Sequence, residues 1–259
     1  METIKVTHID GIHLIDMHPE ILNESQKNYI LRNLGETSGR LLQEETKDEE
    51  IAVVCYGPSL KQTWERLKDY KKILTCSGAH NFLIERGIIP TYHMDCDPRK
   101  SKITFTRKPH PDVEYLMASS CPGRAIKNLK KNKLRLWNLD FGKQLQYPEG
   151  ELVQDSPGCI GLSALDLAAG MLAYRKVDVF GMDCSYTPDT KWAGRHHPNH
   201  EEIKYVMCND QIFKSTRQLV IYAKQFFNVI KKFPDTQITV IGSGLLPEMI
   251  YCEAMKDVK

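Results

Sequence analysis

The feature that most constrains this chain is an alternation of short apolar runs with amphipathic segments, which begins at Ile51. Several runs are continuously apolar, as in strands that are buried on both faces of a sheet. We predict strands at 51–56, 73–76, 92–95, 115–119, 134–139, 177–182 and 238–241. We predict helices between them at 60–70, 80–86, 125–131, 161–174 and 213–233. This alternation is typical of an α/β protein, so we expect a Rossmann-like, doubly wound and mostly parallel sheet flanked by helices.

The first fifty residues differ from the rest in charge. Residues 1–50 carry 5 Lys and Arg against 11 Asp and Glu, whereas the remaining residues carry 30 against 22. Glu24–Leu34 is compatible with one short helix, and Gln43–Glu50 has the composition of a charged, solvated linker. We therefore predict an N-terminal appendage at 1–50 and a nucleotide-binding or transferase domain at 51–259. Removal of residues 1–48 is expected to leave a folded, ligand-binding core.

Composition and cysteine usage set the class of protein. The chain has 259 residues, of which 41% are apolar and 26% are charged, as in ordinary globular proteins. No apolar run approaches the ~20 residues of a membrane helix, and Met1–Asp10 lacks a signal-peptide pattern, so we expect a cytoplasmic protein with no membrane partner. The eight cysteines are scattered singly, which favours structural thiols over one reactive cysteine or a metal site.

The middle of the chain is basic. Lys61–Lys143 contains 18 basic and 8 acidic residues. Solvated helix faces such as Lys127–Lys133 account for part of this excess. The rest fits an anionic ligand such as a nucleotide better than it fits nucleic acid.

Small residues follow the first predicted strand, and doubly wound sheets bind ligands at the carboxyl ends of their strands. Gly57, Pro58 and Ser59 stand between that strand and a helix. Glycine permits a tight turn, and Ser59 can cap the helix while the free N–H groups face an anion. The alternative is an ordinary strand–turn–helix corner.

A second polar turn follows the next predicted strand. Ser77 and Gly78 lead into His80 and Asn81 at the start of a helix. The two side chains could contact a base or a sugar. The alternative is a capping box beside a surface histidine.

Two carboxylates end the third predicted strand. Asp95 and Asp97 stand two residues apart and are followed by Arg99 and Lys100. Hard oxygen ligands of this kind suit Mg²⁺ held jointly with substrate phosphates, and the two cations would neutralise phosphate oxygens. The alternative is an Asp–Arg pair that only fixes the loop.

A helix entry rich in small residues comes next. Ser156, Gly158 and Gly161 open the apolar helix predicted at 161–174. Free N–H groups at such an entry can bind phosphate or carboxylate. The helix itself has the composition of a core helix.

The strand predicted at 177–182 leads into Asp183 and Tyr186, and a polar loop follows. That loop contains His196, His197 and His200. A histidine there could act as a general acid or base or contact a phosphate; a zinc site and a plain surface loop are the alternatives.

Taken in order, these motifs resemble one family. They read G-P-S-L, G-A-H-N-F-L-I-E-R-G-I-I-P, D-x-D, S-P-G-C-I-G-L-S-A-L-D-L-A and V-F-G-M-D-C-S-Y. They resemble the MptE-like family of 6-hydroxymethyl-7,8-dihydropterin pyrophosphokinases, which is related to the domain of motility-associated factors linked to flagellin glycosylation. The resemblance covers residues 51–246. It implies a diphosphokinase that transfers a pyrophosphoryl group from ATP with Mg²⁺, and it matches Asp95 and Asp97 to the acidic strand end.

A second resemblance is to bacterial sialyltransferases of the Campylobacter type. These enzymes pair G-P-S-L with a G-x-D-x-x-Y strand end and a downstream catalytic histidine, which correspond here to Asp183, Tyr186 and the His196/His197 loop. This resemblance implies a glycosyltransferase that uses a nucleotide-activated sugar and a small-molecule acceptor. A non-catalytic nucleotide-binding protein is the third hypothesis. The catalytic candidates are Asp95, Asp97, Asp183 and His197, and the sequence leaves a homo-oligomer open.

Overall fold

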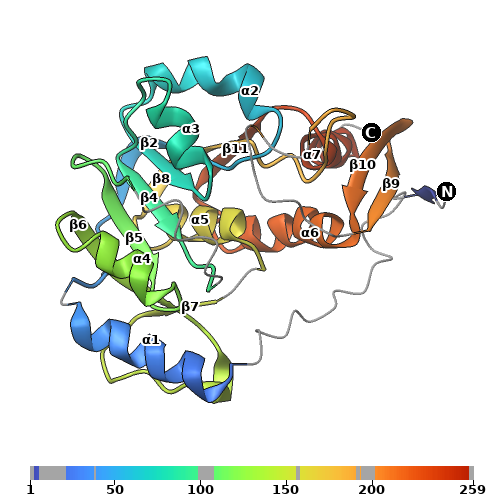
Figure 1. The fold of residues 1–259 in the computed structure, drawn as a ribbon. Helices are drawn as coiled ribbons and strands as arrows, with labels where there is room; N and C mark the ends of the chain where they lie inside the picture. The colour runs from blue at the N-terminus through green and yellow to red at the C-terminus, as the bar shows by residue number, and fades with distance from the viewer. Residues whose placement is uncertain are drawn as a thin grey trace.

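A parallel sheet forms the centre of the computed structural model (Figure 1). The structure describes residues 3–5, 22–37, 39–98, 108–155, 158–190, 193 and 202–256. Across the sheet the eight strands are β11 (Gln237–Ile241), β8 (Tyr174–Phe180), β2 (Lys47–Val54), β3 (Ile73–Cys76), β4 (Tyr92–Asp95), β5 (Glu114–Ala118), β6 (Lys133–Leu139) and β7 (Val153–Gln154). Each neighbouring pair is parallel, so each connection must cross over the sheet.

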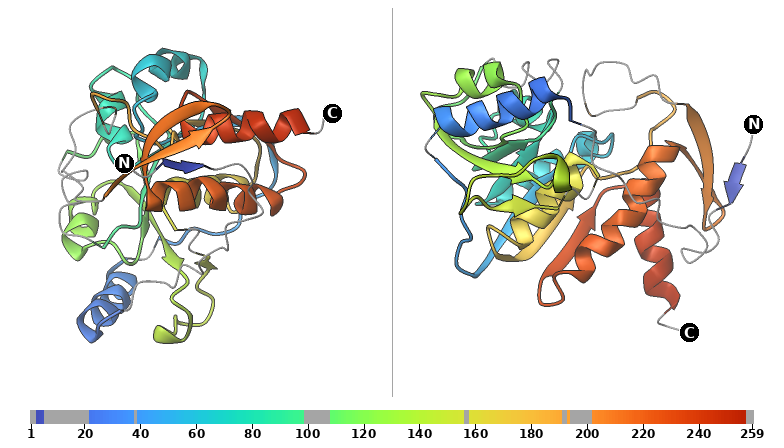
Figure 2. Two further views of the ribbon diagram at one scale, coloured as in Figure 1. Left: turned by 90° about the vertical axis from the view of Figure 1, so that its right-hand side faces the viewer. Right: turned by 90° about the horizontal axis from the view of Figure 1, so that it is seen from below.

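Helices cover both faces of this sheet, as the two views of Figure 2 show. The described helices are α1 (Glu24–Glu36), α2 (Leu60–Thr63), η2 (Trp64–Asp69), α3 (Ala79–Ile84), α4 (Gly123–Asn128), η4 (Gly142–Gln144), α5 (Ile160–Ala169), α6 (Arg217–Lys231) and α7 (Leu245–Lys256). None of these described helices is long and apolar enough to cross a lipid bilayer. The predicted doubly wound, mostly parallel α/β fold is confirmed.

Strand β2 shows why the first apolar run is continuous. Ile51 and Val53 pack into a core cluster with α5, whereas Ala52 and Val54 pack into a second cluster with α2 and α3. All four side chains are 0% exposed. Full burial of a Val or Ile side chain stabilises a fold by about 1.5–3 kcal/mol, so both faces of β2 contribute.

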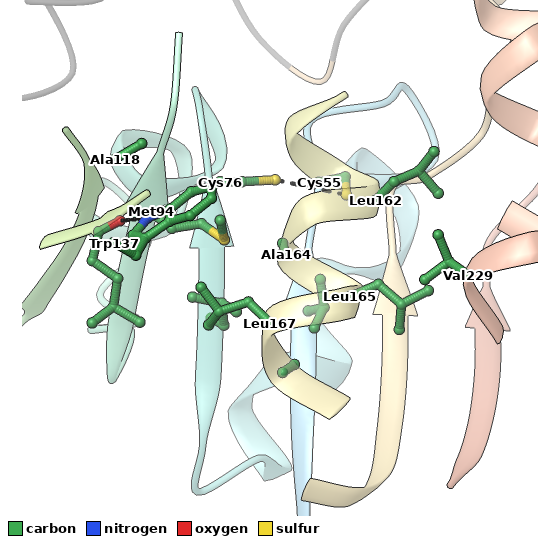
Figure 3. Close-up of a cluster of buried hydrophobic side chains, with 14 of the residues drawn as sticks. Cys55, Cys76, Met94, Ala118, Trp137, Leu162, Ala164, Leu165, Leu167 and Val229 are labelled. Carbon is green, nitrogen blue, oxygen red and sulfur yellow. Dashed lines mark hydrogen bonds between the residues drawn. The ribbon is translucent and has the colours of Figure 1, made fainter. Parts of the chain in front are cut away.

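Helix α5 fills the space between the sheet and α6. Nine of its ten residues are buried, which is the pattern of a core helix. In Figure 3, Leu165 of α5 lies beside Val229 of α6, and α5 also contacts β2, β3 and β8. The helix predicted to run to Tyr174 ends at Ala169, because Gly170 caps it and Tyr174 already begins β8.

Helix α1 packs on the same core as α5. Asn23 and Gln26 form a reciprocal capping box at its start, and Ile30 and Leu34 join the larger core cluster.

Lys47–Glu50, predicted as the end of a linker, form the first half of β2, with exposed side chains from residue 48. The division of the chain at residue 50 stays a prediction.

A small second sheet has the order β1-β9-β10. Its strands are β1 (Thr3–Lys5), β9 (Ile203–Cys208) and β10 (Gln211–Thr216). Asn209 and Asp210 turn the hairpin with φ values of 49° and 62°, as two-residue hairpin turns favour.

The helix predicted from Phe213 begins only at Arg217, so the predicted start of this helix is wrong. Thr216 ends β10 and caps α6 by accepting a hydrogen bond from Leu219 N.

The order of the strands reverses once. From β2 to β7 each strand lies beside the one before it, whereas β8 returns to the other side of β2 and β11 follows it. The topological switch point therefore lies between β2 and β8. Sheets of this type bind ligands outside the carboxyl ends of the strands at such a point.

Candidate functional site

Direct contacts between the ends of β2 and β8 close the switch point. Gly57 N donates to Gly181 O at 2.8 Å. A Cβ on Gly57 would lie 2.5 Å from Gly181 O and 2.8 Å from the carboxyl carbon of Asp183. The predicted tight turn is therefore present, and its close approach requires glycine. Pro58 is buried within it, and its carbonyl accepts from Lys61 N.

The carboxylate of Asp183 binds Ser59 through both oxygens. Ser59 N donates to Oδ2 at 2.7 Å and Ser59 Oγ donates to Oδ1 at 2.5 Å. Burial raises the pKa of Asp183 to about 6, although both donors act to lower it. The prediction that the Ser59 side chain caps α2 is wrong, because its hydroxyl is bound to Asp183. The bonds seen here make Asp183 a link between β2 and β8, and its catalytic role stays a prediction.

The residues that follow β11 pack against Ser59 and Asp183. Gly242 and Gly244 have φ values of 142° and 138°, a region that favours glycine. A Cβ on Gly242 would collide with Ser59 Oγ. Asp183 O accepts from Leu246 N at 3.1 Å, which fixes the start of α7. These residues were not among the predicted site residues, although a Gly-Ser-Gly turn after a predicted strand indicates a tight turn at a strand end.

Tyr186 connects the end of β8 to the small sheet. Its N–H donates to Lys214 O at 2.7 Å, and its side chain is buried. The predicted ligand contact of Tyr186 stays a prediction.

The turn after β3 packs against Tyr56. A Cβ on Gly78 would lie within 2.8 Å of Tyr56 Cζ, so the ring occupies the space that a side chain would fill. Tyr56 also meets the Phe82 ring edge-on at 6.2 Å. Ser77 has a φ of 50° and is buried. These contacts give Ser77 and Gly78 a packing function in addition to any contact with a ligand.

His80 is fully buried, so the alternative of a surface histidine is wrong. Its Nδ1 lies 2.8 Å from Asn81 Oδ1, and its Nε2 lies 3.0 Å from Tyr115 Oη. We assign the Nδ1 proton to His80, because an amide oxygen can only accept, and the Tyr115 hydroxyl then donates to Nε2. Burial lowers the pKa of His80. A ligand that hydrogen-bonds to either ring nitrogen must displace one of these partners.

Asp95 and Asp97 lie at the end of β4, with β3 between them and the switch point. At the usual strand spacing they are about 10 Å from the end of β2. Asp95 is 2% exposed, and its Oδ1 accepts from Cys96 N at 2.8 Å and from Asp97 N at 3.0 Å. These two bonds fix the turn at the strand end. Asp97 follows on that turn and is half-buried.

The turn at Ser119–Cys121, which follows β5, supports this strand end. Ser120 Oγ donates to Cys96 O at 2.8 Å, and the Cys121 thiol donates to Asp95 O at 3.2 Å. The backbone that carries both carboxylates is therefore held from the neighbouring strand.

Side chains of helix α1 hydrogen-bond to the Ser119–Cys121 turn. Asn33 is buried and donates to Ser119 O and Cys121 O, both at 2.9 Å. The Tyr29 hydroxyl donates to Ser120 O at 2.5 Å. Sequence reasoning missed both residues, because these bonds join positions 86 to 91 residues apart and no local motif marks them.

The entry to α5 lies close to the ends of β2 and β8. A Cβ on Gly161 would lie 2.8 Å from Cys55 Sγ and 3.1 Å from Met182 Cε, and Gly158 has a φ of 100°. The N–H groups of Gly161 and Leu162 act on the Cys159 sulfur, whose pKa burial raises to about 12. Sulfur is a weak acceptor, so these donors remain suited to a phosphate oxygen.

Free cysteines gather at this edge of the sheet. All eight cysteines are unbridged thiols. Six of them end a strand, follow a strand or precede α5: Cys55, Cys76, Cys96, Cys121, Cys159 and Cys184. Burial raises the thiol pKa of Cys96, Cys121 and Cys184 well above its usual value, which supports the structural assignment.

Several candidates lie outside the described residues. They are Arg99, Lys100, Ser156, His196, His197 and His200. Within the ranges that the structure describes, no group of three or more His, Cys, Asp or Glu side chains is placed to hold a metal ion.

Comparison with known proteins identifies related sequences and a related fold. The model of the family "6-hydroxymethylpterin diphosphokinase MptE-like" matches residues 22–189, well over half of the chain. Comparison with curated proteins gave no match. The solved structure of a MAf glycosyltransferase from Magnetospirillum magneticum AMB-1 is similar, with a TM-score of 0.63 and 15% identity. The match covers 95% of this chain and 42% of that protein, and at this identity it shows a shared fold.

Proposed function

Because the chain belongs to the 6-hydroxymethylpterin diphosphokinase MptE-like family, we propose that it is a nucleotide-dependent transferase. The first proposed reaction is Mg²⁺-assisted transfer of the pyrophosphoryl group of ATP to a hydroxymethyl or hydroxyl acceptor. One observation carries this proposal: Asp95 and Asp97 stand at the carboxyl end of an interior parallel strand, two strands from the switch point. This is the edge at which such sheets bind ligands.

The donor set at this strand end fits magnesium. Mg²⁺ is usually held by one or two carboxylates together with substrate phosphates and water. Asp95 and Asp97 would supply those carboxylates. Bound there, the ion would neutralise charge on the transferring phosphoryl groups.

The residues of the chain would then orient the reactants. The N–H groups of Cys96 and Asp97 fix the Asp95 carboxylate through Oδ1. The α5 entry at Gly158–Gly161, together with Arg99 and Lys100, would bind the remaining phosphate oxygens. In the transfer, the acceptor oxygen bonds to the β-phosphorus, the bond from that phosphorus to the α-phosphate oxygen breaks, and AMP leaves. His197, which lies outside the described residues, stays the candidate for a general acid or base.

Thermal unfolding with ATP, in the presence and absence of Mg²⁺, tests this reaction. ATP at 100 times its Kd should add about 2.7 kcal/mol of apparent stability. We expect this gain only with Mg²⁺, and we expect Asp95→Asn and Asp97→Asn to abolish it. Asp112→Asn, which removes an exposed carboxylate, is the matched control and should retain it. With a 6-hydroxymethylpterin present, AMP should accumulate.

A metal-independent gain that survives in both variants would contradict the diphosphokinase proposal. It would favour the second candidate, a glycosyltransferase that uses a nucleotide-activated sugar. The Ser59–Asp183 bonds support that candidate, because they join the two motifs that the sialyltransferase pattern pairs. CMP- or UDP-sugars should then stabilise the protein without metal, and the free nucleotide should be released. Stabilisation by any nucleotide without turnover would indicate a non-catalytic binding protein.

A further inference from the structure

Two cysteines outside the proposed site face each other between the small sheet and α7. Cys208 ends β9, Cys252 lies in α7, and their sulfur atoms are 3.9 Å apart. Figure 1 shows α7 beside the β9–β10 hairpin. A second contact fixes their register: Asn209 Nδ2 donates to Glu248 Oε1 at 2.7 Å. The pair is therefore held in place by its own elements.

Both elements also hold the segment that follows β8. From β10, Ser215 Oγ donates to Cys184 O at 2.8 Å. From the start of α7, Leu246 N donates to Asp183 O at 3.1 Å. A disulfide between Cys208 and Cys252 would covalently link the small sheet to α7, the two parts of the fold that hydrogen-bond to residues 183 and 184.

We propose that Cys208 and Cys252 form a modification site that a small-molecule disulfide, such as oxidised glutathione, converts into an intramolecular disulfide. The Cys252 thiol loses its proton, and its sulfur attacks one sulfur of glutathione disulfide. That S–S bond breaks and the first glutathione leaves as a thiol. The Cys208 sulfur then attacks Cys252, its proton is released, and the second glutathione leaves as a thiol. Two protein thiols are oxidised and one small disulfide is reduced.

Exposure sets this order of attack. Cys252 is half-buried, whereas Cys208 is 5% exposed, so the reagent reaches Cys252 first. Burial raises the pKa of Cys208 to about 12, which also makes it the later nucleophile. Cys208 then needs only to reach a sulfur that already lies beside it.

The chain contains a matched comparison. Cys55 and Cys76 have sulfur atoms 3.7 Å apart, and both are buried at the carboxyl edge of the sheet (Figure 3). The thiol of Cys76 and burial raise the pKa of Cys55 well above its usual value. Proximity is thus nearly equal in the two pairs and access differs, so oxidised glutathione should leave Cys55 and Cys76 reduced.

The experiment treats the folded full chain with oxidised glutathione and maps the peptides by mass spectrometry. We expect a loss of two hydrogen atoms, a cross-linked peptide containing Cys208 and Cys252, and a Tm raised by roughly 5 °C because a long loop is closed. A dithiol reductant should reverse all three changes. Cys252→Ser should give neither product nor shift. Cys208→Ser should stop at a glutathione adduct on Cys252, with no rise in Tm.

Two results would overturn the proposal. One is a wild-type protein that keeps glutathione on Cys252 without forming the cross-link. The other is oxidation of Cys55 with Cys76 in the folded protein while Cys208 and Cys252 stay reduced. Neither result bears on nucleotide binding, so this test is independent of the proposed transferase activity.

Discussion

At the scale of single residues, Asp183 joins three strand ends. Its carboxylate accepts from Ser59 beyond β2, it follows β8 itself, and its carbonyl accepts from Leu246 beyond β11. A carboxyl group used in this way is sensitive to its own ionisation, because burial penalises the charged form.

This gives a dependence of stability on pH. Burial raises the pKa of Asp183 from 3.8 to about 6, so between these values the folded protein binds more protons than the unfolded chain. The contribution of this group is therefore fully present below pH 3.8 and is lost as pH rises through 6, by up to about 3 kcal/mol. In Asp183→Asn, the free energy of unfolding should not show this decrease between pH 4 and pH 7; urea unfolding at pH 4, 5, 6 and 7 measures it. If the free energy of unfolding varied with pH in the same way in the wild type and in Asp183→Asn, this prediction would be contradicted. Asp112→Asn is the control and should follow the wild type.

Gly57 gives a second prediction at this scale. Gly57→Ala should lower the free energy of unfolding by more than about 2 kcal/mol, because a Cβ would lie 2.5 Å from a backbone oxygen. Gly35→Ala is the control: nothing lies within 4 Å of a Cβ there, and alanine favours the helix by up to about 1 kcal/mol. Denaturant unfolding measures both. Equal effects would show that the turn after β2 can relax.

At the scale of elements, α1 supports the strand end that carries Asp95 and Asp97. The support runs from Asn33 to the Ser119–Cys121 turn and from there to the backbone of Asp95 and Cys96. Two elements far apart in the sequence are therefore needed to place one pair of carboxylates.

Asn33→Leu should weaken that support. The substitution leaves two carbonyl oxygens without their donor, which should cost about 2–3 kcal/mol of unfolding free energy. It should also reduce the Mg²⁺-dependent stabilisation by ATP. Arg32→Ala, one position away and 66% exposed, should change the free energy of unfolding by less than about 0.5 kcal/mol. A variant that loses stability but retains full Mg²⁺-dependent binding would restrict Asn33 to a folding role.

Local patterns predicted the elements that are local and missed those that depend on distant contacts. The bounds of β3 and β4 agree with the prediction, and every residue of both strands is buried. The hairpin β9–β10 was missed, since only four of its twelve strand residues are buried and its turn contains no glycine. Asn33 and the bonds between Ser59 and Asp183 could not be predicted, because side-chain pairs across more than eighty residues leave no local pattern.

At the scale of the whole molecule, the parallel fold was predictable from strand–helix alternation, whereas the strand order was not. Periodicity says which residues are buried, and it does not say that β8 returns to β2. The place of the switch point, and with it the site, depends on that return.

The packing of α1 also changes what we expect of truncated chains. The sequence favoured a dispensable segment at 1–48, but Ile30, Leu34 and Leu41 are buried in the main core. Because of these contacts, a chain that starts at residue 49 should be insoluble or unfolded, and one that starts at Leu22 should keep more of its stability. Circular dichroism and thermal unfolding of both chains test this. If the chain that starts at residue 49 unfolded cooperatively at the Tm of the full-length protein, residues 1–48 would be dispensable for folding, as the sequence predicted.

The position of β2 has a consequence for how this protein is made. Its partner β3 follows directly, but its other partner, β8, begins at Tyr174, more than a hundred residues later. While the ribosome synthesises the intervening segment, one edge of a strand whose second half is apolar has no partner, and such edges pair readily with other chains. We expect nascent chains that end before Tyr174 to be held by chaperones, and release to follow once β8 has left the exit tunnel.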